Sequence, residues 1–315
     1  MDKKIGILFT SRNNYQLLET WLNTVDVENF SVLNIDEDSD KDIKEHGKQI
    51  CEKYNVTYMD REERGMLNNL VTASNYYKPK GVEWILWFQH DCYPFTDNFF
   101  TELNKTLSSG KYNEFGVLGF NGHQAKASMH QLRIGNQELD VTARAPLEPG
   151  DYWYRNKKYW GNSRPDYSNF EFQKPFAVES VAWYSAMVNI DMYLEHIIPT
   201  DDLHFFHTWD DIAFQYLYKN IYNVCLPSFD VIHDKDHKVS LGFPVSSAYR
   251  NTEHSAERDH LYGKWGHLEV WKERWGWDYN DREGFARVEE NYKDTLLSKF
   301  YNHDPANGPL KSFDI

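Results

Sequence analysis

The chain has 315 residues, a length that suits one sizeable domain with an extension better than three separate domains. Its 48 acidic and 34 basic residues give a formal net charge of −14, which argues against nucleic acid or an anionic membrane as the principal ligand. The cysteines Cys51, Cys92 and Cys225 are odd in number and far apart, which favours a reducing compartment over a disulfide framework. No run has the length of a transmembrane segment or the form of a signal peptide, so we expect a soluble, cytoplasmic protein.

The first hundred residues alternate between short apolar runs and helical patterns, which is typical of βαβ units and a mostly parallel sheet. We expect strands at 5–10, 30–35, 56–59 and 84–88, with helices at 15–25, 42–54 and 64–77 between them. A polar cluster follows each strand, and parallel strands bring such clusters to one edge of a sheet, where ligands bind. No glycine-rich phosphate-binding fingerprint follows the first strand.

The remaining sequence is less regular. Residues 119–176 are rich in Gly, Asn, Pro and aromatic residues, and we expect a long irregular insertion there on the acceptor side. An apolar run at 181–190 is followed by a predicted helix at 212–218 and strand-like pieces at 224–229 and 231–232. We therefore expect an α/β catalytic domain over 1–245 and a helical extension over 246–315, with a helix at 281–300 and a poorly ordered tail.

Three constellations carry chemistry: Gln89-His90-Asp91, the pair Asp210-Asp211, and His233 at the end of a strand. Carboxylates and an imidazole at strand ends can hold Mg²⁺ or Mn²⁺ and leave a free base. Each residue taken singly also has a structural explanation. Asp91 could simply end a strand, one acid of the pair could cap the following helix, and His233 could be a hydrogen-bonded structural histidine.

The ordered set of segments resembles the GT-A glycosyltransferases, and within them the inverting family 2. The opening strand and loop at 5–13 are similar to the nucleotide-binding loop of that family, and Asp36-Glu37-Asp38-Ser39 is similar to its Asp-Asp-x-Ser motif. The segment 84–94 resembles the strand that ends in the D-x-D motif, with Gln89 in the first acidic position. Asp210-Asp211, His233 and Lys264-Trp265-Gly266 then follow in the order of the family's acidic pair, strand-end histidine and Lys-Trp-Gly.

The resemblance implies a GT-A-type sheet and transfer of a sugar, with inversion, from a nucleotide-diphosphate sugar to an acceptor hydroxyl, with a UDP-sugar favoured. It assigns the general base to Asp211, or less favourably to Asp210, and the metal, Mn²⁺ or Mg²⁺, to Asp91 and His233. The donor nucleotide would contact residues near the strand ends, namely Thr10, Arg12, Asp36, Arg64 and Asp91. The acceptor, a glycan, a lipid-linked molecule or a protein, would meet aromatic residues, namely Tyr152, Trp153, Trp160 and Trp209.

Two other functions fit the pattern in part. A nucleotidyltransferase also needs strand-end carboxylates and Mg²⁺, but it would usually show a loop rich in Gly and in Lys or Arg after the first strand, which Ser11-Arg12-Asn13-Asn14 does not supply. An inactive sugar- or nucleotide-binding protein of the same fold is motivated by Gln89, which stands where a second carboxylate is expected. The sequence leaves the donor sugar, the acceptor and the oligomeric state open.

Overall fold

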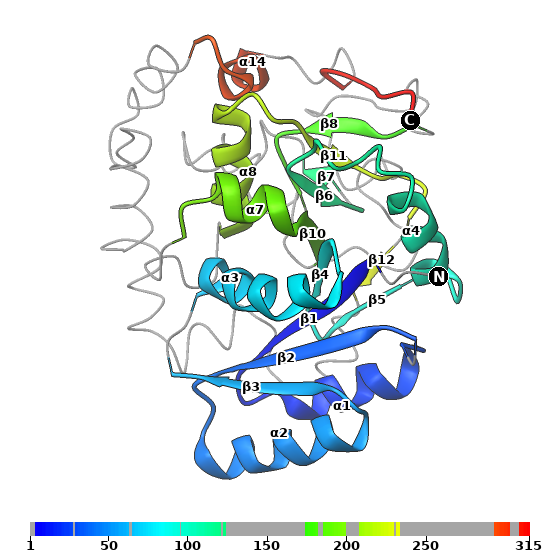
Figure 1. Cartoon of the computed structure of the whole chain (residues 1–315), viewed down its shortest axis with the longest axis vertical. Helices are drawn as coiled ribbons and strands as arrows, with labels where there is room; N and C mark the ends of the chain where they lie inside the picture. The colour runs from blue at the N-terminus through cyan, green and yellow to red at the C-terminus, as the bar shows by residue number, and fades with distance from the viewer. Residues whose placement is uncertain are drawn as a thin grey trace, which may run out of the picture.

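The fold is a mixed eight-stranded sheet with helices packed against it (Figure 1). The computed structural model describes residues 4–27, 29–62, 65–94, 96–120, 122–123, 174–181, 185–199, 208–229, 231–233, 293–302 and 309–315. Strand order in the main sheet is β3-β2-β1-β4-β10-β6-β11-β8. The predicted 119–176 insertion, the predicted boundary at residue 245 and the Lys-Trp-Gly segment lie largely or wholly outside the described residues.

The first four strands form the parallel part of the sheet and agree with the sequence prediction within two residues at each end. They are β1 (Ile5–Ser11), β2 (Ser31–Glu37), β3 (Thr57–Arg61) and β4 (Trp84–Phe88). β1, β2 and β4 are buried on both faces, which is what a central parallel strand requires, while β3 at the edge of the sheet is only half-buried. The strand register sets Ser11 beside Asp36 and Asp36 beside Asp60, so the predicted polar clusters meet at one edge.

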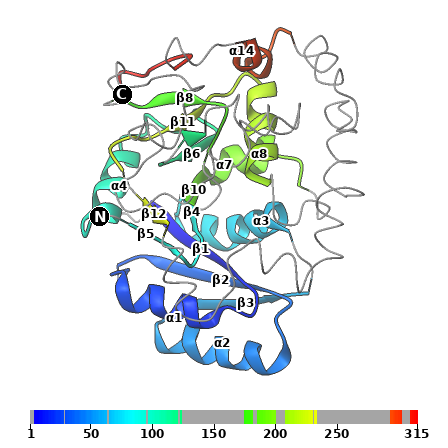
Figure 2. The same ribbon diagram turned by 180° about the vertical axis from the view of Figure 1, so that it is seen from behind.

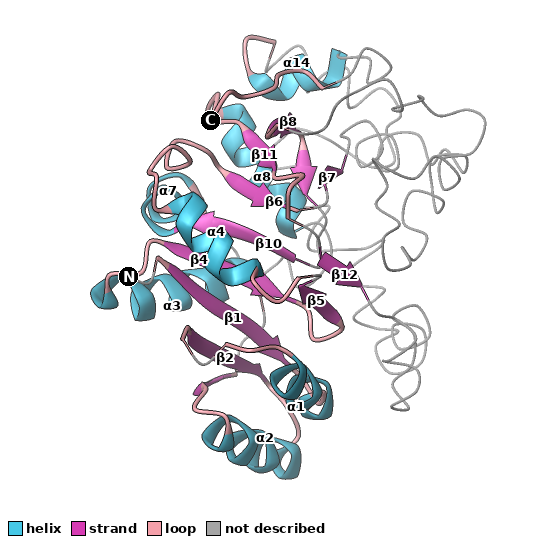
Figure 3. Cartoon of the chain, turned by 90° about the vertical axis from the view of Figure 1, so that its right-hand side faces the viewer, coloured by secondary structure: helices cyan, strands magenta, loops and turns pink. Residues whose placement is uncertain are grey.

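The second half of the sheet is mixed. β10 (Ser185–Asn189) runs antiparallel to β4 and to β6 (Val117–Gly119), and β11 (Asn223–Cys225) is parallel to β6 and antiparallel to β8 (Phe176–Val178). Two short ribbons complete the strands. One pairs β5 (Cys92–Pro94) with β12 (Val231–His233), and the other pairs β7 (Gly122–His123) with β9 (Ser180–Val181). Figure 3 shows β5 and β12 side by side.

The predicted amphipathic helices cover the sheet. α1 (Tyr15–Thr24) and α4 (Phe99–Leu107) bring Trp21 and Phe100 onto Phe88, while α3 (Met66–Tyr77) contacts β1 and β4 through residues that include Tyr77. α2 (Lys41–Lys53) lies beside β3, at the opposite end of the sheet from β8 (Figures 1 and 2). The other helical elements of the described residues are, in chain order, the 3-10 turn Lys78–Lys80, α7 (Ile190–His196), α8 (Thr208–Tyr218) and α14 (Leu296–Asn302).

Two expectations for the end of the sequence need correction. The helix predicted at 281–300 is not continuous, because residues 293–295 form a turn and α14 begins only at Leu296. The predicted poorly ordered tail is instead packed where it is described, since Phe313 is 8% exposed and its backbone N–H bonds the carbonyl oxygen of Pro175 at 2.8 Å. Within the part of the chain that the structure describes, no helix combines the length and the apolar character needed to span a membrane.

Candidate functional site

A buried polar cluster occupies the edge of the sheet where β1, β2 and β4 end. The Ser11 Oγ lies 2.5 Å from Asn34 Oδ1 and 2.9 Å from His90 Nε2. The other ring nitrogen of His90, Nδ1, lies 3.1 Å from Asn14 Nδ2. Ser11 and Asn34 are fully buried and His90 is 5% exposed, so these polar groups depend on one another rather than on water.

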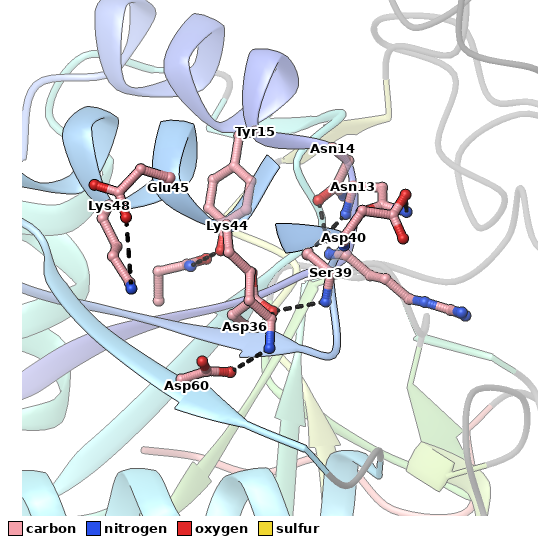
Figure 4. Close-up of polar contacts among 12 residues, drawn as sticks. Asn13, Asn14, Tyr15, Asp36, Ser39, Asp40, Lys44, Glu45, Lys48 and Asp60 are labelled. Carbon is pink, nitrogen blue, oxygen red and sulfur yellow. Dashed lines mark hydrogen bonds and ion pairs between the residues drawn. The ribbon is translucent and has the colours of Figure 1, made fainter. Parts of the chain in front are cut away.

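Asp36 is the carboxylate at the centre of this edge, and it has no exposed surface. One of its oxygens accepts a hydrogen bond from the Tyr15 hydroxyl, and the other accepts the Ser39 backbone N–H at 2.8 Å. The Lys44 Nζ lies 4.0 Å from Asp36 and 2.8 Å from Asp60, as Figure 4 shows. Burial of a charged carboxylate costs free energy, and these hydrogen bonds and the nearby ammonium group of Lys44 offset that cost. In this conformation both oxygens are engaged within the protein, so a direct contact of Asp36 with a nucleotide stays a prediction.

The loops after β1 and β2 hold each other. Asn13 N donates to Ser39 Oγ at 3.0 Å, and the Asn13 and Asp40 groups exchange two further bonds of 3.1 and 2.9 Å (Figure 4). Asn13 and Asp38 have φ angles of 54° and 63°, a left-handed conformation that costs free energy for residues other than glycine. The bonds of Asn13 compensate for part of that cost, so the two loops form one defined surface at the sheet edge.

Two of the predicted donor contacts, Thr10 and Arg12, lie on or next to this surface. Thr10 is half-buried and its Oγ1 accepts the Trp87 indole N–H at 3.3 Å. Arg12 is half-buried and its backbone N–H bonds Asn14 Oδ1 at 3.0 Å. Arg64 lies outside the described residues.

The start of α3 is held against the end of β2 by a second set of hydrogen bonds. Glu37 Oε1 accepts the backbone N–H of Gly65 at 3.0 Å and the Asn69 amide at 2.6 Å. Arg61 adds a bond of 2.8 Å to Asn69 Oδ1. The first turn of α3 therefore lies at the same edge of the sheet as the Asp36 cluster.

The small ribbon sets the backbone of one predicted metal ligand, His233, beside the residue that follows the other, Asp91. Asp91 is 3% exposed, and the next residue, Cys92, pairs directly with His233 in the β5–β12 ladder. Residues opposite each other in an antiparallel pair have Cα atoms only about 4.5–5.5 Å apart. The His233 side chain lies outside what the structure describes, and no cluster of three potential ligands is found among the described residues. A carboxylate beside a histidine position is a donor set that fits a cation completing its shell with phosphate oxygens or water.

The predicted base lies in α8. Asp211 has no exposed surface, and its Oδ2 accepts the Gln215 amide at 2.8 Å. Asp210 belongs to the same helix, but its side chain is not among those described. Trp209 is 2% exposed and its ring centroid is 5.9 Å from that of Trp87, so the start of α8 packs on the end of β4. Trp209 is enclosed in this conformation, and its role in acceptor binding stays a prediction. Tyr152, Trp153 and Trp160 lie outside the described residues.

The sequence pattern did not single out Ser11, Asn34, Tyr15 and His90 as members of one network. A signal was present, because Asn34 interrupts the apolar run of β2 two residues before Asp36 and therefore lies on the same face. Burial and the hydrogen bond to Asp36 raise the pKa of Tyr15 above its ordinary value. Tyr15 therefore stays a protonated hydroxyl that can donate to the carboxylate.

No protein-family model matches the sequence, and a search of curated proteins finds no match. A crystal structure of GalNAc-T7 with UDP, GalNAc and Mn²⁺ matches 95% of this chain with a TM-score of 0.51 and 12% sequence identity. This chain spans 56% of the length of that GalNAc-T7 chain. A crystal structure of S. aureus TarS 1-349 matches 99% of this chain and 94% of its own, with a TM-score of 0.47 and 12% identity. The likeness to GalNAc-T7 shows a GT-A-like fold, as the sequence predicted.

Proposed function

We propose that the protein is a glycosyltransferase that moves a sugar from a nucleotide-diphosphate sugar to a hydroxyl of an acceptor. The observation that carries the proposal is that β12 sets the backbone of His233 opposite Cys92, the residue after Asp91, next to the Ser11–Asp36 cluster of a GT-A-like sheet. A uridine donor and a divalent metal are favoured because GalNAc-T7, which shares the fold, was crystallised with UDP and Mn²⁺. The surface formed by Thr10, Arg12 and the loops after β1 and β2 would take the nucleotide, with Arg64 on the phosphates.

The proposed reaction is a single displacement at the anomeric carbon, with inversion. The acceptor oxygen forms a bond to that carbon while the bond to the diphosphate breaks on the opposite face. Asp211, with Asp210 as the second candidate, takes the proton of the acceptor hydroxyl on a carboxylate oxygen. Asp91 and His233 would hold Mn²⁺ or Mg²⁺, whose positive charge stabilises the departing nucleoside diphosphate.

The acceptor in this proposal is a glycan, a lipid-linked molecule or a protein, with Tyr152, Trp153 and Trp160 as candidates for stacking on a sugar face. A cytoplasmic location is favoured in this proposal because the three cysteines are buried thiols that form no disulfide with one another.

The test is a panel of UDP- and GDP-sugars, with and without Mn²⁺, read by thermal stabilisation and by release of the nucleoside diphosphate. We expect one donor to stabilise the protein with metal and to be hydrolysed slowly. Asp211→Asn should keep donor binding and lower turnover by roughly 10²–10⁴-fold, the usual contribution of a general base. Asp314→Asn is the matched control, because Asp314 is exposed and pairs only with Lys174 in the described contacts.

Several outcomes would overturn the proposal. No stabilisation by any donor would exclude the transferase, and donor binding without any turnover would indicate an inactive nucleotide-sugar-binding protein. Formation of a nucleotide sugar from UTP or GTP and a sugar phosphate, with release of pyrophosphate, would indicate a nucleotidyltransferase. Once an acceptor is known, a product that retains the donor's anomeric configuration would exclude the inverting mechanism and the base role of Asp211.

A further inference from the structure

A continuous line of hydrogen bonds runs beneath the candidate site from the end of β4 to the end of β2. We call it the relay, and its members are His90, Ser11, Asn34, Tyr15 and Asp36. Its links are His90 to Ser11 at 2.9 Å, Ser11 to Asn34 at 2.5 Å, Asn34 to the Tyr15 hydroxyl at 3.3 Å, and Tyr15 to Asp36. Every member is buried, and Tyr15 is only 2% exposed.

The donors and acceptors fit one direction along the relay. Asn14 accepts the Arg12 backbone N–H with its Oδ1 and so turns its amide nitrogen, a donor, toward Nδ1 of His90. Nδ1 of His90 must then accept this hydrogen bond, so the ring proton is on Nε2, which donates to Ser11. The Ser11 hydroxyl donates to Asn34 Oδ1, the Asn34 amide donates to the Tyr15 oxygen, and the Tyr15 hydroxyl donates to the Asp36 carboxylate. One histidine tautomer therefore satisfies every link.

The relay joins the two halves of the proposed donor site. At one end His90 precedes Asp91, the proposed metal ligand, and its Nδ1 holds Asn14 in the loop after β1. At the other end Asp36 holds the backbone of Ser39, whose hydroxyl in turn accepts the Asn13 backbone N–H (Figure 4). The loop that carries Arg12 is thus fixed from both ends of the relay.

We propose that His90 and Tyr15 are positioning residues that hold Asp91 and the two nucleotide-binding loops in one geometry through the relay. The proposal rests on the proposed function and deepens it, because it gives Asp36 an indirect role in donor binding. Asp36 would orient Ser39, and through it Asn13, without contacting the nucleotide. The physical basis of the proposal is the cost of an unmade bond. A buried donor or acceptor that loses its partner destabilises the folded protein. Displacement of one member of the relay therefore favours displacement of the others.

The test compares Tyr15→Phe and Ser11→Ala with Tyr77→Phe. Tyr77 is a matched control, because it is also a buried tyrosine whose hydroxyl bonds protein oxygens, those of Ile7 and Ser31 at 2.6 and 3.0 Å, but it belongs to α3 and lies outside the relay. Binding of UDP and of GDP, each with Mn²⁺, is measured by calorimetry. We expect Tyr15→Phe to weaken binding of the nucleotide by about tenfold, the value of one hydrogen bond to a charged group, and Ser11→Ala to weaken it by about fivefold, the value of a bond between neutral groups. Tyr77→Phe should leave the affinity unchanged.

A second measurement needs no nucleotide. The ring nitrogens of His90, labelled with ¹⁵N, should show the Nε2–H tautomer in the unsubstituted protein. Tyr15→Phe should shift these signals although Tyr15 does not contact His90 in the relay, while Tyr77→Phe should not. Unchanged His90 signals in Tyr15→Phe would overturn the relay, as would the Nδ1–H tautomer. If neither UDP nor GDP binds the unsubstituted protein, the proposed nucleotide site fails and the positioning role fails with it. Normal binding by both relay variants would overturn the positioning role alone.

Discussion

Gln89 occupies the position where the D-x-D motif would supply a second carboxylate to the proposed metal site. It stands two positions before Asp91, is half-buried, and its backbone carbonyl accepts the Cys92 N–H at 3.1 Å. An amide oxygen is a weaker ligand for a hard cation than a carboxylate, and ligand charge tunes the affinity of such sites. Gln89→Asp should therefore tighten Mn²⁺ binding by about tenfold, measured by calorimetry or by the paramagnetic relaxation of water.

Gln89→Asn separates charge from shape, because it shortens the side chain by the same amount and stays neutral. It should not tighten Mn²⁺ binding. Equal Mn²⁺ affinities in the two variants would mean that the side chain at position 89 does not face the cation. Loss of the gain when Asp91→Ala is added to Gln89→Asp is the result expected if both groups belong to one site.

At this scale the ordered motifs predicted Asp91 and His233 as a pair, and the β5–β12 register sets the backbone of His233 opposite Cys92, the residue after Asp91. The bond from Ser39 to Asp36 is local, because the two residues are three positions apart in the sequence. The bond from Tyr15 could not be predicted in the same way, because Tyr15 belongs to α1, whose approach to β2 depends on tertiary packing. A tyrosine at that position is not distinctive in a single sequence.

α2 packs so closely on α1 that one of its residues must lack a side chain. A Cβ built on Gly47 would lie 2.3 Å from Tyr15 Cζ and 2.5 Å from both Cε atoms of the ring. Replacing glycine by alanine inside a helix ordinarily stabilises a protein by about 0.5–1 kcal/mol. Here we expect Gly47→Ala to lower the free energy of unfolding by about 1–3 kcal/mol, because the methyl group overpacks the core against Tyr15. Urea denaturation measures the change.

Glu45→Ala, at an exposed position of the same helix, is the control and should change the stability by less than about 0.5 kcal/mol. Gly47→Ala should also weaken nucleotide binding, because the displaced ring is the one that donates to Asp36. Stabilisation by Gly47→Ala would show that the two helices can separate without loss and would contradict the close packing.

The longer elements of the first hundred residues were predictable because their sequences are long enough to show a pattern. The apolar runs of β1 and β4 are bounded by polar clusters, and α1 shows buried residues at helical spacing. The short strands β6 and β8 are too brief to show alternation, whereas β11 overlaps the strand-like piece predicted at 224–229. The apolar run at 181–190 hides a boundary, because Asn189 ends β10 and caps α7 by accepting two backbone N–H bonds of 3.1 Å.

Over the whole molecule, residues 309–315 close the edge of the main sheet. Ser312 bridges to Phe176 of β8, Ala177 N donates to the Lys311 carbonyl at 2.8 Å, and Figure 2 shows this segment beside β8. No feature of the sequence predicted this contact, because a segment of this length is too short to show a periodic pattern. An exposed edge strand can pair with a strand of another chain. By covering β8, residues 309–315 hinder such pairing at this edge of the sheet.

Phe313 is the buried aromatic residue of that segment. Its removal tests how much the packing of residues 309–315 contributes to the stability of the protein. Its ring centroid lies 4.8 Å from that of Phe115 and 5.6 Å from that of Tyr222, which come from two distant parts of the sequence. Phe313→Ala should lower the free energy of unfolding by about 3 kcal/mol, as for other buried aromatic side chains, measured by urea denaturation. Ile315→Ala is the control, because Ile315 is 38% exposed and should change the stability little. Nucleotide binding should survive in Phe313→Ala, because β8 lies at the opposite end of the strand order from β1 and β2; its loss together with stability would mean that the sheet edge and the donor site fold as one unit.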